Sequence, residues 1–127
     1  MAAEQSAVLN LVAKGDATGL AQTLAEGGDP DARDRWGMSA LARAAAGGQL
    51  EIVQLLLDKG ADVDKSSDAG NTPLMLAAAR GHEAVVAVLL TAGAKAGHRN
   101  KWGVGPADWA KWAENGGAIL ARLNAEG

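Results

Sequence analysis

The sequence of 127 residues contains no cysteine, no phenylalanine and no tyrosine, and it has only two histidines. Without cysteine the chain forms no disulfide and offers no thiolate to a metal, so we expect no metal site and no cofactor. Without phenylalanine and tyrosine, a core must reach its density through alanine, leucine and valine and through close approach of helices. The composition therefore indicates many small contacts instead of a few large aromatic ones.

A strong net charge and a long apolar run are also missing. Twelve basic and fifteen acidic residues give a formal net charge of −3, so bulk electrostatics favours neither nucleic acid nor an anionic membrane as a partner. No segment is long enough to span a bilayer, and Glu4 stands early in an N-terminus without the apolar stretch of a signal peptide. By its length the chain is one domain, residues 1–127, and we expect a monomeric, cytoplasmic protein.

Motifs of catalysis are missing too. No glycine is followed by the Gly-Lys-Ser/Thr of a phosphate-binding loop, and no serine stands in a nucleophile elbow. The acidic run that begins at Asp62 alternates like a calcium-binding loop, but Ser67 and Pro73 occupy the positions that need glycine and glutamate. We therefore expect these aspartates to serve turns, and we expect no catalytic residue and no enzyme.

Glycine, in contrast, is abundant and periodic. Gly37, Gly70 and Gly103 are 33 residues apart. Two further sets keep the same step, namely Gly15, Gly48 and Gly81, and Gly27, Gly60 and Gly93. A fixed period of this size indicates a repeat architecture in which each unit is one small supersecondary element.

The third unit shows the design most clearly. Thr72 is a good N-cap and Pro73 suits the first helical position, which together predict a short helix over 73–80. Gly81 fits a left-handed C-cap, and a second helix with one apolar face is predicted over 83–91. Four leucines on the second helices of the two middle units are expected to be among the most buried residues: Leu56, Leu57, Leu89 and Leu90.

The neighbouring units vary this pattern. Ser39 takes the cap position one period before Thr72, and the segment 61–70 is rich in turn formers and too short for a helix. Such a segment predicts a projecting turn or hairpin. The end units are less regular, and Arg122 and Asn124 in the final helix are expected to form a polar outer face that stops the stack from growing.

These features resemble the ankyrin-repeat family, whose consensus contains Thr-Pro-Leu-His-x-Ala and a later Gly-His. The matching residues are Thr72-Pro73-Leu74, Gly81-His82, Leu89-Leu90 and Gly93-Ala94. The resemblance implies an all-α solenoid of four helix-turn-helix repeats with short turn or hairpin tips, near residues 1–33, 34–66, 67–99 and 100–127.

The resemblance also assigns roles to single residues. It implies that His82 bonds to the backbone of a neighbouring repeat. The consensus histidine after Thr-Pro-Leu is absent, because Ala42, Met75 and Asp108 stand there. His98 has no partner spaced as a motif, so we expect it on the solvated surface.

The four tryptophans are the only aromatic residues. Trp36 and Trp102 each precede a register glycine in a predicted tip. Their rings either lie over the neighbouring turn and stiffen the array, or they anchor a partner. Trp109 and Trp112 are three residues apart on the predicted last inner helix. There they either cap the end of the stack or line the far end of a binding groove.

In ankyrin proteins the tips and the exposed inner-helix positions form a concave surface that binds another protein. The register places these residues on it: Arg35, Trp36, Met38, Arg43, Asp68, Asn71, Arg80, Lys101, Trp102, Val104 and Trp112. This surface is cationic and aromatic at both ends, which suits an acidic and apolar segment of a partner protein.

The resemblance thus implies non-catalytic protein–protein recognition, as an adaptor or an inhibitor of the partner. The alternative is a structural or engineered scaffold without a dedicated partner. The irregular first and last units favour a natural sequence.

Overall fold

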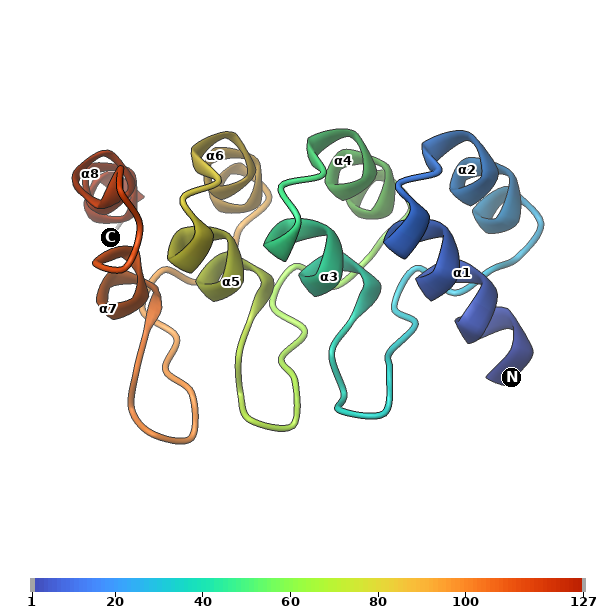
Figure 1. The fold of residues 1–127 in the computed structure, drawn as a ribbon, viewed down its shortest axis with the longest axis horizontal. Coiled ribbons are helices and arrows are strands. Elements are labelled where there is room, and N and C mark those ends of the chain that lie inside the picture. The colour runs from blue at the N-terminus through green and yellow to red at the C-terminus, as the bar shows by residue number, and fades with distance from the viewer. Residues whose placement is uncertain (1, 127) are drawn as a thin grey trace.

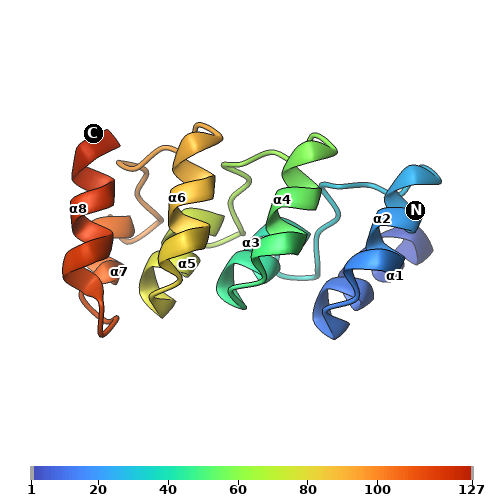
Figure 2. The ribbon, with the colours of Figure 1, turned by 90° about the horizontal axis from the view of Figure 1, so that it is seen from above.

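The computed structural model describes residues 2–126 and, among these, the side chains of residues 7–125. Helices come in pairs that stack along the long axis of the molecule (Figure 1). The inner row consists of α1 (Ala2–Lys14), α3 (Ala40–Ala46), α5 (Pro73–Arg80) and α7 (Pro106–Ala110). The outer row consists of α2 (Ala17–Ala25), α4 (Leu50–Asp58), α6 (Glu83–Thr91) and α8 (Gly116–Glu126). Figure 2 shows the outer helices side by side over the inner ones.

The inner helices of the middle repeats begin at the predicted caps. The Ser39 hydroxyl accepts a hydrogen bond from the Ala42 amide at 3.0 Å, and the Thr72 hydroxyl accepts one from the Met75 amide at 3.3 Å. Both cap side chains are buried, so each satisfies an amide that water could not reach. The helices predicted over 73–80 and 83–91 are confirmed to the residue.

The nine register glycines all have positive φ, between 68° and 101°. At Gly81 this left-handed backbone ends α5, as predicted. At Gly70, with φ of 88°, a side chain would also meet the backbone of the third tip, because an added Cβ would lie 3.1 Å from the Cα of Asn100. The same left-handed backbone conformation, which glycine adopts readily, therefore recurs every 33 residues.

One hydrophobic cluster runs from the first helix pair to the last, and its members are mainly alanine, leucine and valine. Leu56 and Leu89 are fully buried and Leu90 is 6% exposed, as expected. The expectation is wrong for Leu57, which is only partly buried against the cluster. Leu57 follows Leu56 by one residue and therefore points about 100° away from it around α4, at the edge of the apolar face.

Three loops project on one side of the inner helices (Figure 1), and we call their ends the first, second and third tips (residues 34–38, 67–71 and 100–104). Within residues 2–126 the only β-type pairing is an isolated antiparallel bridge between Arg33 and Ser39 at the base of the first tip. The Asp34 carboxylate closes this tip by accepting from the amides of Trp36 (2.9 Å) and Met38 (3.0 Å). Asn100 accepts an equivalent pair of bonds in the third tip.

Neighbouring tips are joined by their backbones. The Asp68 amide donates to the carbonyl oxygen of Trp36 at 3.1 Å, and the Lys101 amide donates to that of Ala69 at 3.0 Å. The Asn100 side chain adds a bond to the Asn71 side-chain oxygen at 3.0 Å. The three tips thus form one hydrogen-bonded row, in which each tip is bonded directly to the next.

Side chains at one register position also join successive inner helices. Gln49 donates to the Val12 carbonyl at 2.8 Å, and Asn115 donates to the Gly81 carbonyl at 3.0 Å. Between them, His82 Nε2 lies 3.0 Å from the carbonyl oxygen of the second repeat's Ala46. A carbonyl only accepts, so the ring nitrogen donates. The role that the ankyrin resemblance gives to His82 is confirmed.

The second histidine corrects the sequence-based expectation. His98 Nε2 lies 3.0 Å from the carbonyl oxygen of Gly70, and the side chain is half-buried. His98 therefore ties the loop before the third tip to the second tip, and it is not a solvated surface residue. Arg122 is exposed, as expected, and it also donates to the Glu83 carboxylate at 2.7 Å, which joins α8 to α6.

The aspartates act as turn residues, as predicted, and they also join repeats. The Asp62 carboxylate accepts from the Asp64 amide at 3.0 Å, which is a local turn bond. The Asp64 carboxylate accepts from the Lys95 amide at 3.0 Å, and the Asp31 carboxylate accepts from the Asp62 amide at 2.7 Å. Each of these two bonds spans 31 residues and links one repeat to the next.

Candidate functional site

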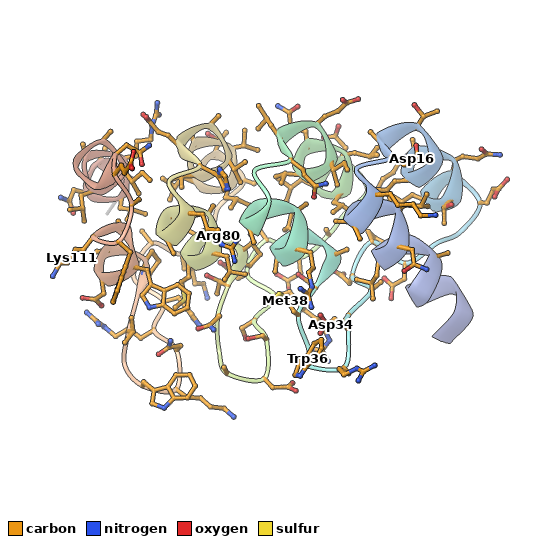
Figure 3. All side chains as sticks on the ribbon, in the orientation of Figure 1. Asp16, Asp34, Trp36, Met38, Arg80 and Lys111 are labelled. Carbon is orange, nitrogen blue, oxygen red and sulfur yellow. The ribbon has the colours of Figure 1, made fainter. Side chains whose placement is uncertain are left out.

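The site is built from two register positions of the inner helices together with the tips, and we call this surface the groove. The first row follows the chain from α1 to α7 as Asn10, Arg43, Leu76 and Trp109. The second row is Ala13, Ala46, Ala79 and Trp112. Because the inner helices pack side by side, residues one period apart lie next to each other. Figure 3 shows the labelled Trp36, Met38 and Arg80 on this side of the molecule.

At the N-terminal end of the groove, charged side chains surround Trp36. Arg43 donates to Asp34 Oδ2 through Nε at 3.0 Å and also through Nη2. The guanidinium carbons of Arg35 and Arg43 lie 5.3 Å and 5.8 Å from the centroid of the Trp36 ring. The ring is thus flanked by two cations within cation–π range, and 59% of the residue is exposed.

Asp34 is the residue that organises this end. Partial burial works against its ionisation, but the hydrogen bonds from Arg43 and from the amides of Trp36 and Met38 outweigh that effect. Together they hold the pKa of the Asp34 carboxyl below its ordinary value of 3.8. Asp34 therefore stays charged at neutral pH and fixes both the tip and the guanidinium of Arg43.

At the C-terminal end, the groove contains an open hollow of about 390 Å³ between α5 and the turn that follows α7. Its lining consists of Leu76, Ala79, Arg80, Trp109 and Trp112. Trp112 is 82% exposed, so it does not serve as a cap over the end of the stack. Trp109, which is half-buried, lines the same hollow as Trp112.

The placement of Trp112 on the last inner helix is wrong. The helix α7 ends at Ala110, so Trp112 belongs to the turn that follows. The third repeat ends its inner helix at Gly81 with a left-handed cap, whereas the equivalent residue here is Glu114. Trp112 nevertheless reaches the same hollow as Trp109.

The remaining predicted residues lie on the tips. Trp102 is 72% exposed in the third tip, between the exposed Lys101 and the half-buried Val104. Asp68 is exposed in the second tip. Asn71 is engaged with Asn100 in the row of tips, so its side chain already has a structural partner.

A model of the ankyrin-repeat family, comprising three copies of the repeat, matches residues 9–100. The chain belongs to the ankyrin-repeat family. Ankyrin repeats are generally protein–protein interaction modules and are typically non-catalytic. A search of curated proteins gave no significant match to the ankyrin chain. In this ankyrin array the consensus histidine after Thr-Pro-Leu is replaced in the third repeat by Met75, which is fully buried.

Two features of the ankyrin array were not predicted from the sequence. One is Asp34, whose register position is shared by Ser67 and Asn100, both of which also bond within their tips. The other is the ion pair of Arg99 and Asp108, with Arg99 Nη1 at 3.4 Å from Asp108 Oδ2. The sequence carried a signal for Asp34, namely a polar residue two positions before each tip tryptophan.

The main role of Asp108 is to cap the start of α7, and its ion pair with Arg99 is secondary. Its carboxylate accepts from the Gly105 amide at 3.0 Å, and this bond, followed by the nearby charge of Arg99, lowers the pKa of Asp108 below 3.8.

Within residues 2–126 no helix is long and apolar enough to cross a membrane. Among the described side chains of the ankyrin array, no three His, Asp or Glu residues gather in a way that could hold a metal ion.

Proposed function

We propose that the chain binds a partner protein through the groove and the tips, without catalysing a reaction, as an adaptor or an inhibitor. One observation carries the proposal. Among the described side chains, the large apolar residues that are mainly exposed are Trp36, Trp102 and Trp112, and all three belong to the groove or the tips. An exposed indole loses water-contacting apolar area when a partner covers it, and tryptophan is enriched among interface hot spots.

Charge supports a particular kind of partner. The groove and tips carry Arg35, Arg80 and Lys101 beside the exposed tryptophans, although the whole chain has a net charge of −3. An acidic and apolar segment would meet complementary charge on this surface. We propose that the chain acts as a monomer in the cytoplasm, and light scattering of the purified protein tests the first part.

The test is the double substitution Trp36→Ala with Trp102→Ala. We expect it to abolish capture of the partner from the native host, because it removes the indoles of both tips. We expect the melting temperature to change by only a few degrees, since both side chains are mainly exposed. Capture is measured by pull-down with mass spectrometry, and stability by thermal denaturation.

The matched control is Glu51→Ala with Gln54→Ala on the outer helix α4, where both residues are exposed. This pair should capture the partner as the wild type does. Retained capture by the double tryptophan variant, together with a large loss of stability, would contradict the proposal. A scaffold without a partner would capture no protein that the tryptophan substitutions release.

A further inference from the structure

The hollow at the C-terminal end of the groove differs from the rest of the groove in its lining. Along the second row the residues are Ala13, Ala46 and Ala79, and then Trp112. Three small side chains thus line this row over α1, α3 and α5, and a large indole stands at its C-terminal end. We call the hollow beside Trp112 the α5–α7 pocket, lined by Leu76, Ala79, Arg80, Trp109 and Trp112.

The pocket is mostly apolar but contains one cation. Three arginines of the described part of the chain have carboxylate partners, namely Arg43 with Asp34, Arg99 with Asp108 and Arg122 with Glu83. Among the described side chains, no carboxylate forms an ion pair with Arg80, which is exposed at the end of α5. Arg80 therefore brings an uncompensated charge to the pocket.

The size and the lining narrow the range of ligands. A volume of about 390 Å³ lies near the low end of small-ligand clefts, at about 300–1,000 Å³, and accommodates one or two side chains. Two indoles alone would also attract a quaternary ammonium group. Arg80 repels such a cation, whereas a carboxylate would form a charge-assisted and bidentate pair with its guanidinium.

We propose that the α5–α7 pocket recognises a segment of the partner in which a large apolar side chain stands next to a carboxylate. The apolar side chain packs against Leu76, Trp109 and Trp112, and the carboxylate binds Arg80. This inference rests on the proposed function, which it narrows from the whole groove to one anchor. Arg80 sets the preference for acidic segments, and the indoles supply the apolar contact.

The test uses nuclear magnetic resonance with a defined probe. The probe is a capped octapeptide of alternating leucine and aspartate, and its counterparts carry asparagine or lysine instead of aspartate. The protein has four tryptophans, so four indole N–H resonances report on its surface. We expect the acidic probe to shift those of Trp109 and Trp112, with a Kd about tenfold lower than for the asparagine probe, as for one charged hydrogen bond.

Two variants separate the charge from the apolar contact. Arg80→Gln should bind the acidic and asparagine probes equally, whereas Lys59→Gln, which removes the same charge at the far end of α4, should keep the tenfold difference. Trp112→Ala should weaken binding of both probes without unfolding, because the side chain is 82% exposed. Equal affinities for all probes, or identical behaviour of Arg80→Gln and Lys59→Gln, would overturn the inference.

The outcomes distinguish a failure of the pocket inference from a failure of the proposed function. If the acidic probe does not bind while capture of the partner still depends on Trp36 and Trp102, the pocket inference fails and the proposed function stands. If the probe shifts the indoles of the tips alone, the anchor lies there and not between α5 and α7. If the probe binds as expected but no partner depends on the tryptophans, the proposed function falls and the pocket stands.

Discussion

At the scale of single residues, Asp34 connects several features of the groove. Its carboxylate accepts from two tip amides and from Arg43, which in turn lies beside the Trp36 ring. One side chain thus connects the shape of a loop, the position of a guanidinium and the setting of an exposed aromatic. Hydrogen bonds to a charged group are each worth about 1.5–3 kcal/mol, more than those between neutral groups.

We predict that Asp34→Asn lowers the free energy of unfolding at pH 7 by about 1–3 kcal/mol. The pKa of Asp34 is lowered in the folded state. The stability that its charge supplies is therefore present above pH 3.8 and is lost as the pH falls through the folded-state pKa. Urea denaturation between pH 7 and pH 2 should show the two proteins converging at acidic pH.

The control for this prediction is Asp58→Asn, at an exposed position at the end of α4. Its cost should stay below about 0.5 kcal/mol. A constant difference between wild type and Asp34→Asn at every pH would show that lost packing, and not lost charge, causes the destabilisation.

Single residues also show which contacts could be predicted from the sequence and which could not. The caps Ser39 and Thr72 and the turn at Gly81 were predictable, because each depends on contacts within a few residues. The bond from His98 to Gly70 was not, because it spans 28 residues and matches no consensus position. Trp36 was predictable as a tip residue, but the two flanking guanidiniums depend on side-chain directions that spacing does not give.

At the scale of elements, the short inner helices depend on their neighbours. The helix α5 has eight residues and α7 has five, and helices of this length are marginal alone in water. Spacing alone suggested one shared helix face for Trp109 and Trp112. The early end of α7 at Ala110 could not be read from that spacing, because a three-residue spacing places two side chains on one face only where the helix continues through both.

We predict that Leu89→Ala lowers the free energy of unfolding by about 2–5 kcal/mol, because Leu89 is fully buried in α6 and its loss leaves a cavity. Leu57→Ala, at a partly exposed position in α4, is the matched control and should cost clearly less. Urea denaturation measures both. A cost below about 0.5 kcal/mol for Leu89→Ala would place this residue outside the core.

At the scale of the whole molecule, the contacts are those of a solenoid. Each helix pair packs against the adjacent pairs, and one hydrophobic cluster continues from Val8 to Leu123. Stability in such arrays is close to a sum of repeat terms and interface terms. The 33-residue period made this architecture predictable, whereas the bonds from Asp64 to Lys95 and from Arg122 to Glu83 required the structure.

We predict that residues 1–127 unfold as one cooperative unit, because the core has no interruption between repeats. Tryptophan fluorescence reports on the first tip, the third tip and the last repeat, whereas far-ultraviolet circular dichroism reports on all helices. The two urea transitions should coincide. An earlier fluorescence transition would show that the last repeat unfolds separately and would divide the proposed domain.

The hydrogen-bonded row of tips has a consequence for the entropy of binding. The bonds from Asp68 to Trp36 and from Lys101 to Ala69 are made between backbone atoms, so they do not depend on the indole side chains of the tips. The backbone segments that carry Trp36 and Trp102 are therefore connected through the second tip before any partner arrives. A partner that contacts both tips orders few backbone torsions in this protein, and the free energy gained at each contact is correspondingly retained as affinity.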